Sequence, residues 1–149
     1  MSKRRELSFA SLDEVMPEVD RLLQGYKTVG NWSLGQICNH LVLGIHASVE
    51  QQPPALPWIV RKTVARVILK RVLSTGRMRE NVQIPDEFRP KSGLDDRAEA
   101  EALRAAIPLF LAANFTPADH PFFGPLTFEQ WNQLHRIHCA HHLSFVIPT

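Results

Sequence analysis

The sequence has few of the features that mark a secreted or membrane protein. Only two of its 149 residues are cysteines, Cys38 and Cys139, which is too few for a disulfide framework and typical of a reducing compartment. No apolar run approaches the roughly 20 residues that a membrane span requires. The basic N-terminal stretch continues into mixed sequence rather than into the apolar core of a signal peptide. We therefore expect a cytoplasmic protein with no membrane partner.

Charge of one sign is also scarce. The formal net charge is +2, from 17 basic and 15 acidic residues, which is too small to indicate a nucleic-acid partner by itself. Seven basic residues are concentrated between Arg61 and Arg79. Trp58 is essentially the only aromatic residue near them, whereas single-strand binders interleave aromatic and basic side chains. We predict no nucleic-acid partner and interpret this stretch as a solvated helix face, with an anionic lipid or ligand as the alternative.

Strand patterns and internal repeats are absent as well, and helical patterns take their place. With 44% hydrophobic and 21% charged residues over 149 positions, the sequence predicts one globular domain, 1–149. We expect helices in five stretches, which favours an antiparallel bundle. The first begins at a capping box formed by Ser11 and Glu14, or near Met16 because Pro17 follows, and ends at Gly25. The second begins at Asn31 or Ser33 and ends before Pro53, and the others cover 57–73, 95–114 and 127–147.

Histidines are the most informative residues present. Four of the seven lie in the last predicted helix, at His135, His138, His141 and His142. Because a helix turns about 100° per residue, His138 and His142 share the face that carries the apolar stripe. Two histidines four residues apart on one helix face form a common bidentate metal site, although buried histidines are also often simple hydrogen-bonded core residues. In a bundle, His40 of the second helix can join them in a three-histidine site with open coordination positions.

Helical direction also separates candidate ligands from other residues. Cys38 lies about 160° from His40 and Cys139 about 100° from His138, so we expect neither cysteine to bind a metal. His46 points about 120° away from His40 and is predicted to be a surface residue. Geometry alone leaves His135 open as an alternative ligand to His142.

Three stretches resemble the DinB-like superfamily, also called YfiT-like. They are residues 32–41 (WSLGQICNHL), 120–131 (HPFFGPLTFEQW) and 135–145 (HRIHCAHHLSF). The resemblance extends over residues 9–148 and is greatest to a branch of uncharacterised function. It implies an all-α fold, an antiparallel up-down four-helix bundle with an extra short helix or loop insertion and an unusual connection between its second and third helices.

The same resemblance implies a metal site and a cofactor. Its ligand positions match His40, His138 and His142, and we expect a divalent ion, zinc or nickel. Characterised relatives include transferases that use bacillithiol or mycothiol and a mycothiol-dependent isomerase, so a low-molecular-weight thiol is an implied cofactor. The superfamily continues with arginine, glycine and glutamine after its paired histidines. This chain has Leu143, Ser144 and Phe145 there, so the roles of those residues do not carry over.

Two functions from different classes are compatible with these residues. One is a metal-dependent transferase or hydrolase, in which the ion lowers the pKa of a bound water or thiol. Gln36 and His135 are then candidates for contacts with a cofactor or substrate, because of their direction on their helices. No carboxylate clearly faces His40 or His138, which disfavours a glutamate base of the metalloprotease kind. The other is a non-catalytic metal-stabilised or ligand-binding bundle, in either case a candidate homodimer.

Overall fold

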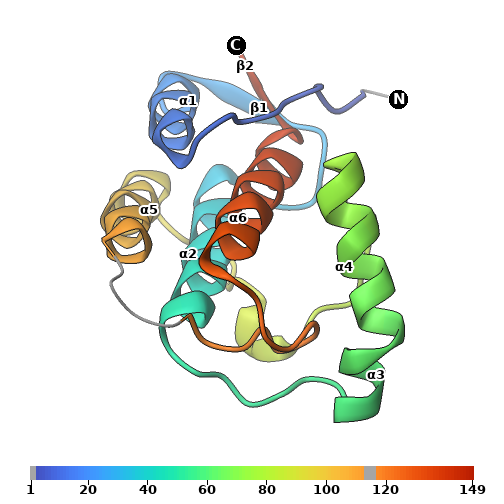
Figure 1. The fold of residues 1–149 in the computed structure, drawn as a ribbon. Coiled ribbons are helices and arrows are strands. Elements are labelled where there is room, and N and C mark those ends of the chain that lie inside the picture. The colour runs from blue at the N-terminus through green and yellow to red at the C-terminus, as the bar shows by residue number, and fades with distance from the viewer. Residues whose placement is uncertain (1–2, 113–116) are drawn as a thin grey trace.

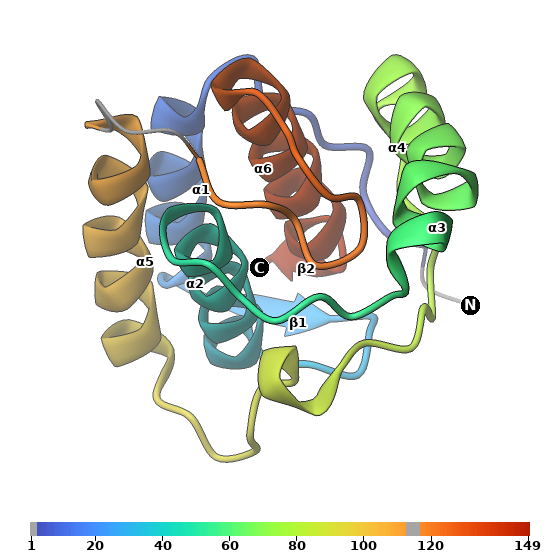
Figure 2. The same ribbon diagram turned by 60° about the horizontal axis from the view of Figure 1, so that its bottom comes forward.

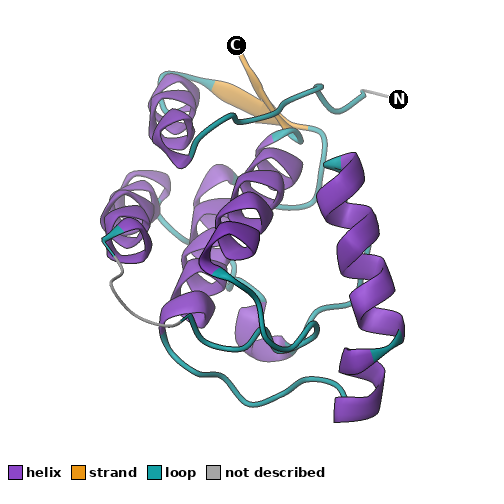
Figure 3. Cartoon of the chain, in the orientation of Figure 1, coloured by secondary structure: helices purple, strands orange, loops and turns teal. Residues whose placement is uncertain are grey.

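Helices make up most of the structure, with one small sheet (Figures 1 and 3). The computed structural model describes residues 3–112 and 117–149. The elements are the 3-10 helix η1 (Leu12–Glu14), α1 (Val15–Leu22), β1 (Tyr26–Thr28), α2 (Leu34–Val49), α3 (Trp58–Lys62), α4 (Val64–Thr75), the 3-10 helix η2 (Asp86–Phe88), α5 (Asp96–Leu111), α6 (Phe128–Leu143) and β2 (Val146–Pro148). Within the described residues, every helix is too short or too polar to traverse a lipid bilayer. These elements make the chain mostly helical, as predicted.

The core lies between α1, α2, α5 and α6, which run side by side in Figures 1 and 2. Helix α2 packs chiefly on α5, and α4 packs on α6 from the other side. Both site helices, α2 and α6, are thus held between layers of other helices. The largest fully buried side chains of this core include Trp131, Phe110, Leu22, Leu34, Ile37 and Leu41.

A two-stranded antiparallel sheet joins the chain after α1 to the chain after α6. Tyr26 pairs with Pro148 and Thr28 with Val146. We predicted no strand, and we predicted that the last helix extends over 127–147, whereas it ends at Leu143. Three-residue strands are too short to show an alternating pattern, and their pairing depends on residues far apart in the sequence. The sequence signal was therefore too weak to reveal them.

The third predicted helix, over 57–73, is broken in two. Thr63 has φ −116° and ψ −93° and separates α3 from α4, and its hydroxyl donates to the Ile59 carbonyl at 2.7 Å. Helical spacing on this stretch predicts an apolar stripe of Val60, Val64, Val67, Ile68 and Val72, and only part of it is buried. Val64, Val67 and Ile68 are 60%, 70% and 51% exposed, whereas Val72 is buried together with Ala65 and Leu69. Apolar residues surround this helix on most sides, so the sequence pattern could not single out the packed face.

The first and fourth helices begin where the sequence predicts. Ser11 and Glu14 form a capping box at η1, and Asp95 caps α5 by accepting from the backbone of Ala98. Helix α5 continues through Pro108 and ends at Leu111 one turn later. The predicted end of this helix, Asn114, lies outside the described residues.

Candidate metal centre

Each of the two site helices begins with a capping box. At α2, the backbone N–H of Gln36 donates to the Ser33 hydroxyl, while the Gln36 side chain accepts from the Ser33 backbone. Thr127 and Gln130 form the same reciprocal pair at α6. A capping box fixes where a helix starts. The start in turn sets the direction in which each later side chain of that helix points.

Three histidine nitrogens meet between these helices. The Nε2 atom of His40 lies 3.0 Å from Nε2 of His138, which lies 3.1 Å from Nε2 of His142. The candidate ligand atoms of the three residues all lie within 4.8 Å of one another. Three nitrogens that share an ion at about 2.0–2.1 Å lie roughly 3.3 Å apart in tetrahedral geometry. The convergence predicted for His40, His138 and His142 is therefore present in the structure.

The positions of the protons on these rings favour the binding of an ion. His40 Nδ1 lies 2.7 Å from the Phe88 carbonyl, which can only accept, so Nδ1 carries the proton and Nε2 has a free lone pair. Neutral His138 can donate one Nε2 proton, either to His40 or to His142 but not fully to both. In the absence of an ion, at least one of the two Nε2–Nε2 contacts therefore has no full hydrogen bond. A cation at the centre interacts favourably with all three lone pairs.

Aromatic and small residues hold the three rings. Trp32 stacks on His142 with a centroid distance of 5.4 Å and lies 5.0 Å from the ring centroid of His40. Gly44 lies beneath His138, where a Cβ atom would approach ring atom Cε1 to 3.3 Å. Together these contacts limit how far the imidazoles can turn.

Burial keeps the three imidazoles neutral at neutral pH. Desolvation lowers the pKa of His40, and desolvation together with the neighbouring imidazoles lowers the pKa of His138 well below its ordinary value. Burial, followed by the charge of His40, lowers the pKa of His142 to about 2. Neutral imidazole is the form that binds metals. The site therefore needs no deprotonation step to offer three nitrogen ligands near pH 7.

His135 and Gln36, the predicted cofactor or substrate contacts, have different surroundings. His135 is buried and lines a cavity beside the three histidines, and its Nε2 lies 2.9 Å from the Ser48 hydroxyl. Because Ser48 donates its proton to the Ile45 carbonyl, His135 donates to Ser48. Gln36 caps α2 and is not among the residues that line the cavity. The structure thus brings His135 to the cavity and leaves Gln36 outside its wall.

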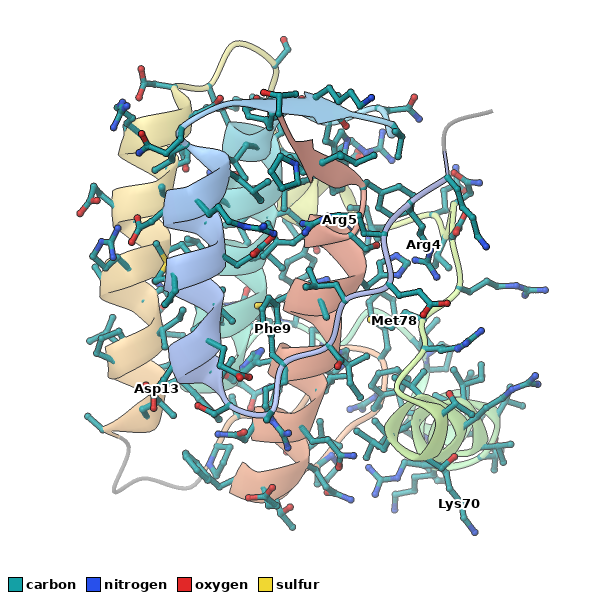
Figure 4. The ribbon with its side chains drawn as sticks, turned by 90° about the horizontal axis from the view of Figure 1, so that it is seen from above. Arg4, Arg5, Phe9, Asp13, Lys70 and Met78 are labelled. Atoms are coloured by element: carbon teal, nitrogen blue, oxygen red, sulfur yellow. The ribbon has the colours of Figure 1, made fainter. Side chains whose placement is uncertain are left out.

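His141 is tied to the N-terminal segment. The guanidinium of Arg4 lies 3.0 Å from His141 Nδ1, forms an ion pair with Glu80 at 3.1 Å, and stacks over Phe145. Figure 4 shows Arg4 on this segment beside α6. His141 also lines the cavity. His46 is exposed, as predicted.

Two contacts of the site were not predicted. A backbone carbonyl such as that of Phe88 has no residue-type signal, so nothing in the sequence could identify it as the partner of His40. Arg4 lies 137 positions from His141 and belongs to no helical pattern. The role of Gln36 did have a signal, because Ser33 followed three residues later by glutamine is a capping-box pattern.

The cysteines stay apart from the cluster. Cys38 and Cys139 are buried and free, and neither belongs to the group that could hold a metal within the described residues. Burial raises the pKa of each thiol to about 12. Both therefore remain protonated at neutral pH, which makes them poor ligands and poor nucleophiles.

A cavity of about 660 Å³ opens beside the three histidines. Helices α2, α4 and α6 contribute to its wall, together with the segments before α5 and before α6. His40, His138 and His142 all line it, so the cluster borders this cavity. This volume falls within the range of about 300–1,000 Å³ that small-molecule sites occupy.

The fold and this cluster define a mostly helical protein with a candidate three-histidine metal centre at the wall of a ligand-sized cavity. The chain belongs to the family described as Protein of unknown function (DUF1569), which matches residues 1–149. No curated protein and no solved structure matches it.

Proposed function

We propose that the protein binds a divalent metal ion through His40, His138 and His142 and uses it in a metal-dependent transfer or hydrolysis reaction on a small molecule. The observation that carries this proposal is the meeting of three Nε2 atoms, with neighbouring contacts of 3.0 and 3.1 Å, at the wall of the cavity. Three protein ligands with open coordination positions are typical of catalytic zinc sites, whereas structural sites are closed by four. The cavity therefore supports catalysis over a purely structural metal.

The chain's own residues have separate parts in this proposal. The Phe88 carbonyl orients His40 through Nδ1, and Trp32 and Gly44 limit the rotation of the other two rings. Apolar side chains around the cavity exclude water from a bound substrate. A divalent ion, when bound, supplies Lewis-acid chemistry that stabilises negative charge developing on substrate oxygen or sulfur.

We further propose that the chain is a distant member of the DinB-like superfamily. The side-by-side packing of α1, α2, α5 and α6 supports an up-down four-helix bundle, with α3 and α4 as an insertion between the second and third helices of that bundle. The position of one histidine on α2 and two on α6 is the arrangement that the resemblance implies. Zinc or nickel and a low-molecular-weight thiol remain the metal and cofactor that we propose on this basis.

The test is elemental analysis of protein purified without a polyhistidine tag, followed by an activity screen with low-molecular-weight thiols. We expect about one zinc or nickel ion per chain in the wild type, and loss of stoichiometric metal in His40→Ala, His138→Ala and His142→Ala. His135→Ala and His141→Ala are matched controls from the same helix and should keep the metal. Loss of metal in His135→Ala with retention in His142→Ala would overturn the ligand assignment.

A further inference from the structure

The wall of the cavity is mainly apolar away from the histidine cluster. Aliphatic and aromatic side chains reach it from α4, from the segment before α6 and from α6 itself. They include Ile68, Val72, Phe122, Phe123 and Leu134. Such a wall binds a hydrocarbon or aromatic body and offers few partners to a sugar or a peptide backbone.

The charges on the cavity wall are all of one sign. Arg79 and Arg89 line the cavity, and no aspartate or glutamate does so within residues 3–112 and 117–149. Arg89 forms a long ion pair of 3.8 Å with the exposed Asp86 and a long hydrogen bond of 3.5 Å to the Ile84 carbonyl. No hydrogen bond or ion pair to another described residue is found for Arg79, whose side chain is exposed. Arginine recognises carboxylate, sulfonate and phosphate groups through paired N–H donors.

Two interactions connect the segment that carries both arginines to the histidine end of the cavity. Glu80, next to Arg79, pairs with Arg4, which also contacts His141. Phe88, next to Arg89, accepts from His40. Arg79 and Arg89 are therefore each adjacent in sequence to a residue whose contacts hold it at the histidine end of the cavity. The segment that carries both arginines is thus anchored at the histidine end, whereas Ile68, Phe122 and Phe123 reach the cavity from α4 and from the segment before α6.

We infer that the cavity binds an amphiphilic anion, with a carboxylate or similar head at the histidine and arginine end and an aliphatic or aromatic body along the apolar wall. This inference rests on the proposed function, because a bound metal ion adds positive charge at the same end. The arginine and apolar contacts are independent of the ion. They give the metal-free protein its own, weaker affinity for such an anion.

The test is calorimetric titration of untagged, metal-loaded protein with decanoate, decanol, decyltrimethylammonium and acetate. We expect saturable one-to-one binding of decanoate, binding of decanol that is weaker by about tenfold or more, and no binding of the cation or of acetate. Equal affinity for decanoate and decanol would overturn the anion preference. Absence of saturable decanoate binding would overturn the whole inference.

Variants separate the head from the body of the ligand. Arg79→Gln and Arg89→Gln should each weaken decanoate binding by several-fold to about tenfold while leaving decanol binding unchanged. Arg71→Gln is the matched control, because Arg71 is exposed on α4 and does not line the cavity. Ala65→Phe, which fills part of the cavity, should weaken both ligands. If that variant does not fold, hexanoate replaces it, since a shorter chain should bind the wild type more weakly than decanoate.

Metal content measured in the same samples distinguishes the two proposals. Decanoate binding without stoichiometric metal would contradict the proposed function and leave the amphiphilic-anion site standing. Stoichiometric metal without decanoate binding would contradict only the inference made here.

Discussion

Gly44 allows His138 to lie close against α2. A Cβ atom at this position would come within 3.3 Å of ring atom Cε1 and 3.4 Å of Nδ1 of His138. Either the ring or the helix must then move by a few tenths of an ångström. Since His138 Nε2 is the nitrogen nearest to both other candidate ligands, a small shift of this ring alters two distances at once.

Gly44→Ala should therefore change metal affinity and stability in opposite directions. Alanine favours a helix interior over glycine by about 1 kcal/mol, so the metal-free protein should unfold no more easily than the wild type. Displacement of His138 should lower metal affinity by roughly tenfold, the effect typical of changes next to a ligand. Competition with a chromogenic chelator and urea unfolding measure the two quantities. Unchanged affinity would show that the ring has room to adapt. His46→Ala, on the exposed side of α2, is the control.

His135 predicts a pH dependence of stability. Burial, with a smaller contribution from His120, lowers the pKa of His135 to about 3, whereas an unfolded chain has a histidine pKa near 6.5. Between these values the unfolded state binds a proton that the folded state does not. The free energy of unfolding should therefore fall as pH decreases below 6.5, by up to about 1.4 kcal/mol per pH unit from this residue.

The measurement is urea unfolding of chelator-treated protein at pH 7.5, 6.0 and 5.0. In His135→Gln, an amide can still donate to Ser48. The free energy of unfolding of this variant should decline less steeply between pH 6 and pH 5 than that of the wild type, by about the contribution of one bound proton. The His46→Gln variant controls for loss of a histidine from an exposed position. Identical slopes for the wild type and His135→Gln would show that His135 does not titrate in this way.

At the scale of the helices, the capping boxes determine how the site is presented. Thr127→Ala removes the hydroxyl that accepts from Gln130 N–H at 3.1 Å. We expect the free energy of unfolding to fall by about 1 kcal/mol, and Thr127→Ser to restore most of it. Metal stoichiometry should stay near that of the wild type at saturating metal, because the later turns of α6 remain packed. A loss of metal as large as in His142→Ala would mean that α6 cannot keep its orientation without this cap.

Local signals account for what the sequence could predict at this scale. Helix starts at Ser11, Asp95 and Thr127 were predicted correctly because a cap and its helix are neighbours in sequence. The convergence of His138 with His142 follows from helical spacing alone. Their approach to His40 also needed the packing of α2 near α6, for which the sequence offered only the resemblance to other proteins.

Non-local features could not be predicted in the same way. The pairing of β1 with β2 joins segments from nearly opposite ends of the chain, and neither segment is long enough to show a pattern. The break at Thr63 depends on backbone angles for which Thr63 has no marked preference. The cavity is a property of how several segments pack, so its volume and its charge asymmetry appear only when the wall is assembled.

At the scale of the whole molecule, metal binding should be visible as stability. An ion that binds only the folded state stabilises it by about 2.7 kcal/mol at a free concentration one hundred times its dissociation constant. The melting temperature of the wild type should therefore rise with added zinc or nickel and fall with a chelator. The melting temperature of His142→Ala should respond to neither. A metal-dependent rise of equal size in that variant would place the ion elsewhere.

His40 and His138 are separated by 98 positions along the chain. An ion that bridges them would close a loop that contains most of the polypeptide, so it would act as a reversible cross-link between the early and late parts of the sequence. Cross-links of long loops restrict the unfolded chain most in polymer theory, although the dependence on length is only logarithmic. If the metal stays bound to only one helix while the protein unfolds, it no longer restricts the unfolded chain in this way. An isolated α6 peptide, which offers His138 and His142 without His40, should bind the same ion far more weakly than the folded chain.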